Sequence, residues 1–215
     1  MDFVIFILAR AGSKRLPGKN VMAFRHFNDA TFRHFPDAKS IVDVAIDKSL
    51  RFVDDKDALL IVDSDIDSIL CKYHLGYGEK IRMHERLAQF RGDDVNPVDV
   101  LMEHIRIMDP EDWPGYVILT QATSPNWDLS ELESAFRHLK LMKGSGLFTV
   151  NPAYKPNGCF YIMRTRDMME QRTLFVEDCE VHCMNWRGSL DIDHIWDMRA
   201  TQAVIEGRAF GYSGD

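Results

Sequence analysis

Short apolar segments alternate with segments of helical periodicity along the chain, and this alternation restricts the possible folds more than any other feature. Strands that alternate with helices require right-handed crossovers and form a mainly parallel sheet with helices on both faces. The sequence therefore predicts a three-layer, Rossmann-like α/β fold that binds ligands at the carboxyl ends of its strands. The expected strands are Phe3–Ala9, 58–62, Tyr116–Thr120, Gly146–Val150 and 159–163, and the expected helices are 40–52, 66–73, 97–108, 129–143 and 194–206. Residues 172–190 are less regular, and we expect short strands of a β excursion there.

The composition is typical of a folded domain that binds neither nucleic acid nor membranes. The chain of 215 residues is long enough for one full core and short for two, so we expect a single domain over residues 1–215. The hydrophobic fraction of 46% is close to the average of globular proteins. The net charge of -7 repels nucleic acids and anionic lipids, so a polyanionic ligand would need a local cluster of cations.

The first apolar run does not fit a targeting signal. Phe3–Ala9 is short, follows Asp2 instead of a basic region and leads into Arg10, so we expect neither a signal peptide nor a membrane span. A cytoplasmic location and reduced cysteines are therefore expected. The cysteines and the histidine within residues 179–183 would lack a fourth zinc ligand, so a structural zinc site is not expected there.

A cluster of cations follows the first expected strand of this acidic protein. Residues 10–20 read RAGSKRLPGKN, with cations at Arg10, Lys14, Arg15 and Lys19. Glycines in such a loop let backbone N–H groups approach an anion, and the cations can bind its phosphates. The loop therefore predicts a polyphosphate site, and the alternative is a solvated basic loop. Its spacing fits neither a Walker A loop nor a G-x-G-x-x-G dinucleotide motif.

Five blocks of the sequence resemble the acylneuraminate cytidylyltransferases, the enzymes that make CMP-sialic acid from CTP and the free sugar acid. Residues 7–20 resemble the family's N-terminal signature, and VDSD at 62–65 resembles its second strand exit. LTQATSP at 119–125 resembles its LLQPTSP, PNGCFYI at 156–162 its PNGAIYI, and SLDID at 189–193 its IDID. The resemblance implies a nucleotidyltransferase fold and the transfer of CMP from CTP to a sialic-type (nonulosonic) sugar acid, with release of pyrophosphate.

The resemblance also implies where the two substrates bind. The nucleotide-binding residues would be Ala9, Arg10, Gly12, Ser13, Lys19 and Asn20, of which Arg10 and Lys19 would also be catalytic. The sugar acid would contact Gln121, Ser124, Asn157 and Gly158. For Gln121, the alternative is an amide at a strand end that satisfies local backbone groups. No residue stands out as a general base.

Two pairs of aspartates could bind a divalent cation. In an extended segment, Asp191 and Asp193 project to the same face, and the resemblance makes them catalytic ligands of Mg²⁺. An alternative for Asp193 is the N-cap of the helix at 194–206. Asp63 and Asp65 form a D-x-D motif, so a glycosyltransferase that uses a nucleotide diphospho-sugar is an alternative function. The second alternative function is that of a non-catalytic protein that binds a nucleotide.

The chain departs from the family at positions that bear on its substrates. Only residues 151–155 stand where the family usually has a long excursion that supplies dimer contacts and part of the sugar pocket. The sugar wall near residues 151–190 is therefore shortened, and a homodimer is possible without that excursion. Asn126 and Trp127 replace a Leu-Arg pair, and MHERLA at 83–88 stands where the family has an arginine-proline motif beside the pyrimidine.

Overall fold

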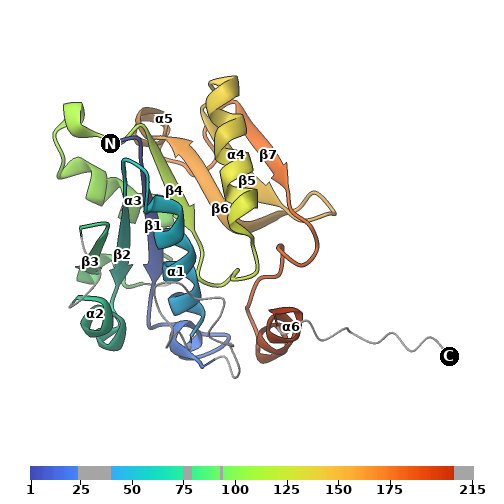
Figure 1. Cartoon of the computed structure of the whole chain (residues 1–215). Coiled ribbons are helices and arrows are strands. Elements are labelled where there is room, and N and C mark those ends of the chain that lie inside the picture. Colours follow the sequence, from blue (N-terminus) through green and yellow to red (C-terminus); the bar gives the residue numbers. More distant parts are fainter. Residues whose placement is uncertain (24–39, 75–78, 93, 206–215) are drawn as a thin grey trace.

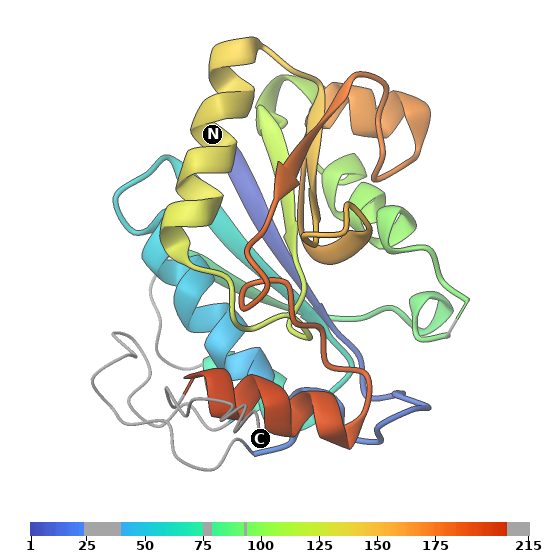
Figure 2. The same ribbon diagram turned by 90° about the vertical axis from the view of Figure 1, so that its right-hand side faces the viewer.

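A seven-stranded sheet with helices on both faces forms the centre of the molecule (Figures 1 and 2). The computed structural model describes residues 1–23, 40–74, 79–92 and 94–205. The strand order is β3-β2-β1-β4-β6-β5-β7, and only β6 runs antiparallel to its neighbours in this sheet. The expected mainly parallel α/β fold is confirmed. The strands are β1 (Phe3–Ala9), β2 (Ala58–Ser64), β3 (Ile81–Glu85), β4 (Tyr116–Thr120), β5 (Gly146–Val150), β6 (Pro156–Arg164) and β7 (Cys179–Cys183).

The helices divide between the two faces of the sheet. On one face lie α1 (Ile41–Val53), α2 (Asp67–His74) and α4 (Leu129–Met142), and on the other lie α3 (Pro97–Arg106) and α5 (Thr165–Gln171). The last helix, α6 (Ile195–Ile205), lies beside the loop that follows β1 (Figure 2). Within the described ranges, short 3-10 helices connect these elements: η1 (Lys19–Val21), η3 (Ala88–Phe90) and η4 (Pro110–Asp112).

Strand β1 shows how the apolar sequence builds the core. Phe3, Ile5 and Ile7 face α1 and α4, whereas Val4 and Phe6 face α3 and α5. Because successive side chains of a strand alternate between faces, a strand buried on both sides must be apolar throughout. All five side chains are fully buried, and each contributes about 1.5–3 kcal/mol relative to an exposed position.

Local caps determine where the helices begin. Ser40 caps α1, since its hydroxyl accepts a hydrogen bond from the Asp43 amide at 3.3 Å and the Asp43 carboxylate accepts one from the Ser40 amide at 3.0 Å. Helix α3 begins with Pro97 after the cap residue Asn96, whose side chain accepts a hydrogen bond from the Val98 amide. These caps agree with the helix starts expected near residues 40 and 97.

Strand β3 and helix α5 were not expected from the sequence. β3 reads IRMHE, without a continuous apolar run, and pairs with β2 at one end of the described sheet. α5 has seven residues and buries little besides Met168. Both elements owe their stability to the sheet that they join more than to their own patterning. β7 lies within the region where a β excursion was expected, and Glu206, the expected end of the last helix, is outside the described residues.

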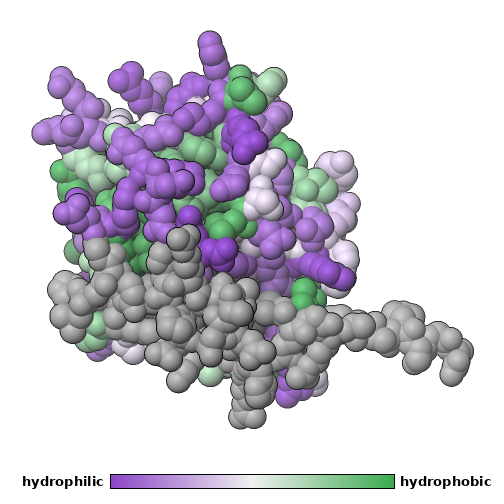
Figure 3. Space-filling model, in the orientation of Figure 1, coloured by the Kyte–Doolittle hydropathy of each residue, from purple (hydrophilic) through white to green (hydrophobic). Residues whose placement is uncertain are grey.

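Hydrophilic side chains predominate on the face shown in Figure 3, with hydrophobic ones scattered among them. Among the described residues, we find no helix with the length and apolar character needed to span a bilayer.

Candidate functional site

A cavity of about 610 Å³ opens at the carboxyl ends of β1 and β4. Parallel α/β sheets bind ligands at this edge, so the cavity lies where the strand order predicts a site. The four cations of the loop after β1 and the two carboxylates before α6 all line it. Those residues are Arg10, Lys14, Arg15, Lys19, Asp191 and Asp193, together with Ser13, Asn20 and Gln121.

Three hydrogen bonds stabilise the loop after β1, two to neighbouring segments and one within the loop. The Ala11 amide donates a hydrogen bond to Asp65 at the end of β2, at 2.7 Å. The Asn20 side-chain amide donates to the Arg10 carbonyl at 2.9 Å, and the Arg10 guanidinium donates to the Gly92 carbonyl at 3.2 Å. The loop is therefore held in a defined shape around the cavity.

The cations of this loop meet the carboxylates directly. The Lys19 ammonium lies 3.3 Å from Asp193 Oδ1 and donates a hydrogen bond to the Ile192 carbonyl at 2.5 Å. The Arg15 guanidinium lies 2.5 Å from Asp193 Oδ2. Ile192 is fully buried between the two aspartates, so both carboxylates lie on the cavity side of this extended segment. The segment and the loop are thus joined through charge pairs as well as through apolar packing.

Asp191 is held by the turn that follows β4. Ser124 donates a hydrogen bond to Asp191 Oδ1 at 3.3 Å, and the Ile192 amide donates to the Thr123 carbonyl at 2.8 Å. Asp191 keeps an exposed edge, yet the protein packed around its carboxyl group raises the pKa of Asp191, and the negative charge of Asp193 adds to this rise. Hydrogen bonds from Thr123 and Ser124 act in the opposite direction. A cation beside the two carboxylates would relieve their mutual repulsion.

Asp193 does not cap α6 with its side chain. Asp197 has that role, because its carboxylate accepts hydrogen bonds from the Asp193 amide at 3.0 Å and the His194 amide at 2.7 Å. The Asp193 carboxylate is therefore directed to Lys19 and Arg15.

The residues expected around the sugar acid have different environments. Gln121 lines the cavity. Gly158 lies next to the Gln121 side chain and has a left-handed φ of +74°. Asn157 accepts a hydrogen bond from the Cys159 amide, and its buried Nδ2 has no partner among the described residues. Ser124 is fully buried and contacts Asp191. Of the expected residues in the described chain, Ser124, Asn157, Gly158, Ala9 and Gly12 are not part of the cavity lining.

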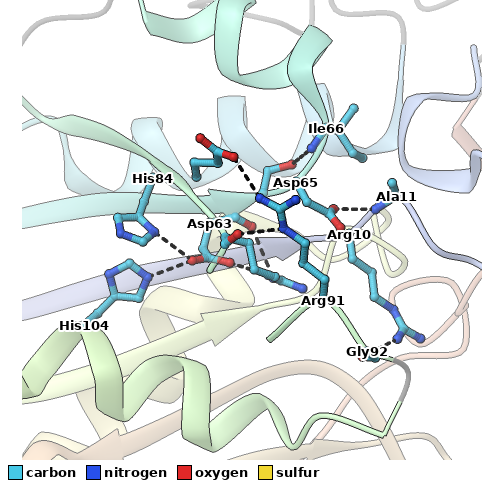
Figure 4. Close-up of polar contacts among 12 residues, drawn as sticks. Arg10, Ala11, Asp63, Asp65, Ile66, His84, Arg91, Gly92 and His104 are labelled. Atoms are coloured by element: carbon cyan, nitrogen blue, oxygen red, sulfur yellow. Dashed lines mark hydrogen bonds and ion pairs between the residues drawn. The ribbon is translucent and has the colours of Figure 1, made fainter. Parts of the chain in front are cut away.

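The D-x-D motif at the end of β2 does not face the cavity. Asp63 is almost completely buried and contacts Arg86, His84 and His104, while Asp65 binds the Ala11 amide (Figure 4). Neither carboxylate is among the described residues that line the cavity. This arrangement disfavours the glycosyltransferase alternative, because in that function the two aspartates would have to lie beside the bound nucleotide diphospho-sugar.

The structure adds residues that the site assignment from sequence omitted. Arg15 pairs with Asp193, Thr123 lies beside Asp191, and the segment between β3 and α3 supplies a wall that includes Arg86 and Phe90. Arg15 belongs to the basic loop, so the sequence contained its signal. The wall depends on how β3 pairs with β2, which no local pattern indicated.

The comparisons with known proteins agree with this geometry. No family model matches the chain. The N-acylneuraminate cytidylyltransferase of Streptococcus agalactiae serotype III (strain NEM316) is 26% identical over 227 residues, which are 90% of this chain and 51% of that protein. The enzyme of the same name from serotype V (strain ATCC BAA-611 / 2603 V/R) is 25% identical over the same shares. The chain thus spans about half the length of the curated relatives it matches.

Three solved structures share the fold. The CMP:2-keto-3-deoxy-manno-octonic acid synthetase complexed with CTP has a TM-score of 0.65 and 14% identity, over 96% of this chain and 99% of that one. The 4-diphosphocytidyl-2C-methyl-D-erythritol synthase from Anaerococcus prevotii DSM 20548 has a TM-score of 0.57 and 11% identity, over 95% and 96%. The manganese complex of Rv0371c from Mycobacterium tuberculosis H37Rv has a TM-score of 0.55 and 10% identity, over 93% and 97%. The chain therefore has the fold of these solved structures, and in sequence it is similar to the N-acylneuraminate cytidylyltransferases.

Proposed function

We propose that residues 1–215 form one nucleotidyltransferase domain, which acts in the cytoplasm and transfers CMP from CTP to a sialic-type sugar acid with release of pyrophosphate. The observation that carries this proposal is the convergence of four cations and two carboxylates on one cavity, with Lys19 3.3 Å from Asp193. Two further findings support the choice of substrates. The sequence relatives are named N-acylneuraminate cytidylyltransferases, and one structural neighbour is complexed with CTP.

The loop after β1 would bind the triphosphate. Arg10, Ser13 and Lys19 line the cavity and can donate charge-assisted or hydroxyl hydrogen bonds to phosphate oxygens. Each such bond to a charged group contributes about 1.5–3 kcal/mol, so three would contribute about 4.5–9 kcal/mol before the entropic cost of association is subtracted. Ala9 and Gly12 would supply the backbone around the phosphates, and Asn20 would lie near the ribose or the base.

Asp191 and Asp193 would hold Mg²⁺. Both offer hard oxygen ligands along one side of the cavity, as Mg²⁺ prefers, and the manganese complex of Rv0371c supports a divalent ion in this fold. When bound, the ion would neutralise triphosphate charge as pyrophosphate departs. The chain's own part is to orient these carboxylates: Ser124 holds Asp191, and Lys19 and Arg15 hold Asp193.

The sugar acid would enter beside Gln121. Its hydroxyl would attack the α-phosphorus in line with the departing pyrophosphate. The cations of the basic loop would stabilise the negative charge of that leaving group. Gln121 lies on the cavity wall, and Gly158 leaves room for the amide of Gln121 because an added Cβ would lie 3.2 Å from its nitrogen. The resemblance also assigns Asn157 to the sugar, although Asn157 lies outside the cavity lining and its side-chain nitrogen is buried. The short turn at residues 151–155 would leave this side of the cavity less enclosed.

A pyrophosphate-release assay tests the proposal. The purified chain is incubated with Mg²⁺, each of the four nucleoside triphosphates and a panel of sugar acids that includes N-acetylneuraminate and 3-deoxy-manno-octulosonate. We expect release only with CTP and a nonulosonic acid, and its loss in Lys19→Ala. CTP binding in a thermal-shift assay without release from any sugar acid would instead indicate a non-catalytic nucleotide-binding protein. Binding of a nucleotide diphospho-sugar instead of free CTP, together with sugar transfer that requires Asp65 and not Asp191, would favour a glycosyltransferase.

A further inference from the structure

A second cluster of possible metal ligands lies at the end of β2, outside the cavity lining. His84 Nδ1 and His104 Nε2 each lie 3.0 Å from the same oxygen, Oδ2 of Asp63 (Figure 4). The three ligand atoms all lie within 4.8 Å of one another. Asp63 belongs to β2, His84 to β3 and His104 to α3, so the cluster joins three elements that are distant in sequence. It has no part in the nucleotide chemistry proposed above.

We propose that Asp63, His84 and His104 bind a transition-metal ion of the zinc class. Two imidazole nitrogens and one carboxylate oxygen are a ligand set that Zn²⁺ and Co²⁺ accept and that Mg²⁺, which prefers oxygen, does not. Zinc bonds to such ligands are about 2.0–2.1 Å long, so the ligand atoms of a tetrahedral site lie about 3.3 Å apart. The two observed distances of 3.0 Å are close to that spacing.

Arg86 orients the Asp63 carboxylate toward the two histidines. Arg86 donates a hydrogen bond to Oδ1 of Asp63, which leaves Oδ2 to face the two rings. Oδ1 of Asp63 thus has the hydrogen-bonded partner that is typical of a carboxylate in a metal site.

The two histidines differ in a way that suits ion entry. The His104 side chain is only 7% exposed and packs against Phe6, with ring centroids 5.3 Å apart, so its orientation is fixed. The His84 side chain is 39% exposed, which gives an ion a path from solvent and leaves room for a water ligand. With three protein ligands and an open fourth position, the site would be of the open type.

A bound ion would affect the cavity through Arg86. This residue lines the cavity, and its guanidinium also donates a hydrogen bond to the Asp63 carbonyl at 3.2 Å. An ion that joins β2, β3 and α3 would therefore hold the cavity wall in place without contacting the nucleotide. The chain would then bind two kinds of metal at separate places, one at carboxylate oxygens alone and one at two imidazole nitrogens and a carboxylate oxygen.

Cobalt titration of the whole chain tests this site with a spectroscopic readout. The chain is treated with a chelator, and Co²⁺ binding is followed by visible absorption while Zn²⁺ binding is followed by calorimetry. We expect one ion per chain, with the intense d–d bands of a four- or five-coordinate nitrogen and oxygen site. His84→Ala should weaken binding by at least about 100-fold, since even the loss of an outer partner of a ligand costs about 10- to 100-fold.

Two control variants locate the ion. His138→Ala removes an exposed histidine of α4, and Asp191→Asn alters the proposed magnesium site; both should bind Co²⁺ as the unmodified chain does. Because His84 is partly exposed, His84→Ala should retain the fold, which circular dichroism checks. The proposal is overturned if His84→Ala binds cobalt as tightly as the unmodified chain. It is also overturned if a sulfur-to-cobalt charge-transfer band shows that cysteines bind the ion, or if no ion binds at all.

Discussion

Lys48 of α1 provides a test of how the turn after β4 is held. Its ammonium donates hydrogen bonds to the Pro125 carbonyl and, at 2.6 Å, to the Trp127 carbonyl, and it lies 5.2 Å from the centre of the Trp127 ring. Burial lowers the pKa of Lys48 from 10.5 to about 8, although Asp128 and Glu131 partly offset this effect. The lysine thus closes the turn that carries Gln121 and Ser124, and the folded state bears a cost for the buried charge.

The size and sign of the pH effect follow from this shift. One pKa unit corresponds to about 1.4 kcal/mol, so a fall from 10.5 to about 8 corresponds to about 3 kcal/mol. This is an upper limit, because the side chain keeps some contact with solvent. Below pH 8 Lys48 is protonated in both states. Between about pH 8 and 10.5 only the unfolded state keeps the proton, so the contribution of Lys48 to the free energy of unfolding rises with pH.

Urea unfolding of the unmodified chain and of Lys48→Met, from pH 7.5 to 10.5, measures this effect. Methionine has a similar shape and no charge, and the other groups that titrate in this range are present in both proteins. We expect the unfolding free energy of the unmodified chain to rise by up to about 3 kcal/mol relative to the variant. Lys140→Met, at an exposed lysine, is the control and should leave the profile unchanged. Parallel profiles for the unmodified chain and Lys48→Met would refute the reasoning.

Three further substitutions test the site. Lys19→Ala should weaken CTP binding about 10- to 100-fold in calorimetry, since one charge-assisted contact is lost; unchanged affinity would remove the basic loop from the site. Asp191→Asn should lower kcat while leaving the Kd for CTP nearly unchanged, because its role concerns the transition state; full turnover would place the metal elsewhere. Gly158→Ala should lower the unfolding free energy by about 1–2 kcal/mol, because alanine is strained at a φ of +74° and would crowd Gln121. Gly12→Ala is the control: its added Cβ would meet nothing within 4 Å, so it should leave the unfolding free energy nearly unchanged.

The sequence predicted the parts of the fold that strong local patterns specify. The largely buried strands β1, β2 and β4 and the capped helices α1 and α3 have the expected positions to within a few residues. β3 and α5 could not be predicted in this way. Their residues are mostly polar, and pairing with β2 or packing on the sheet stabilises them.

The same distinction applies to the candidate site. The basic loop and the D-I-D segment could be identified because their charges cluster along the chain, and the structure brings them to one cavity. Their roles in catalysis remain predictions. The contacts of Asp63 with His84 and His104 could not be identified, because each residue comes from a different element and meets the others only through the sheet register and the packing of α3.

The pairing of Asp193 with Lys19 and Arg15 has a consequence for ligand discrimination. A free polyanion must displace a carboxylate that is tethered in place, and it would leave that carboxylate without a counter-charge. Under the proposed function, a triphosphate that arrives with its own divalent cation would exchange partners instead. Its phosphates would pair with Lys19 and Arg15, and its cation would pair with Asp193. The resting site would therefore reject sulfate or pyrophosphate alone more strongly than a nucleotide already complexed with metal.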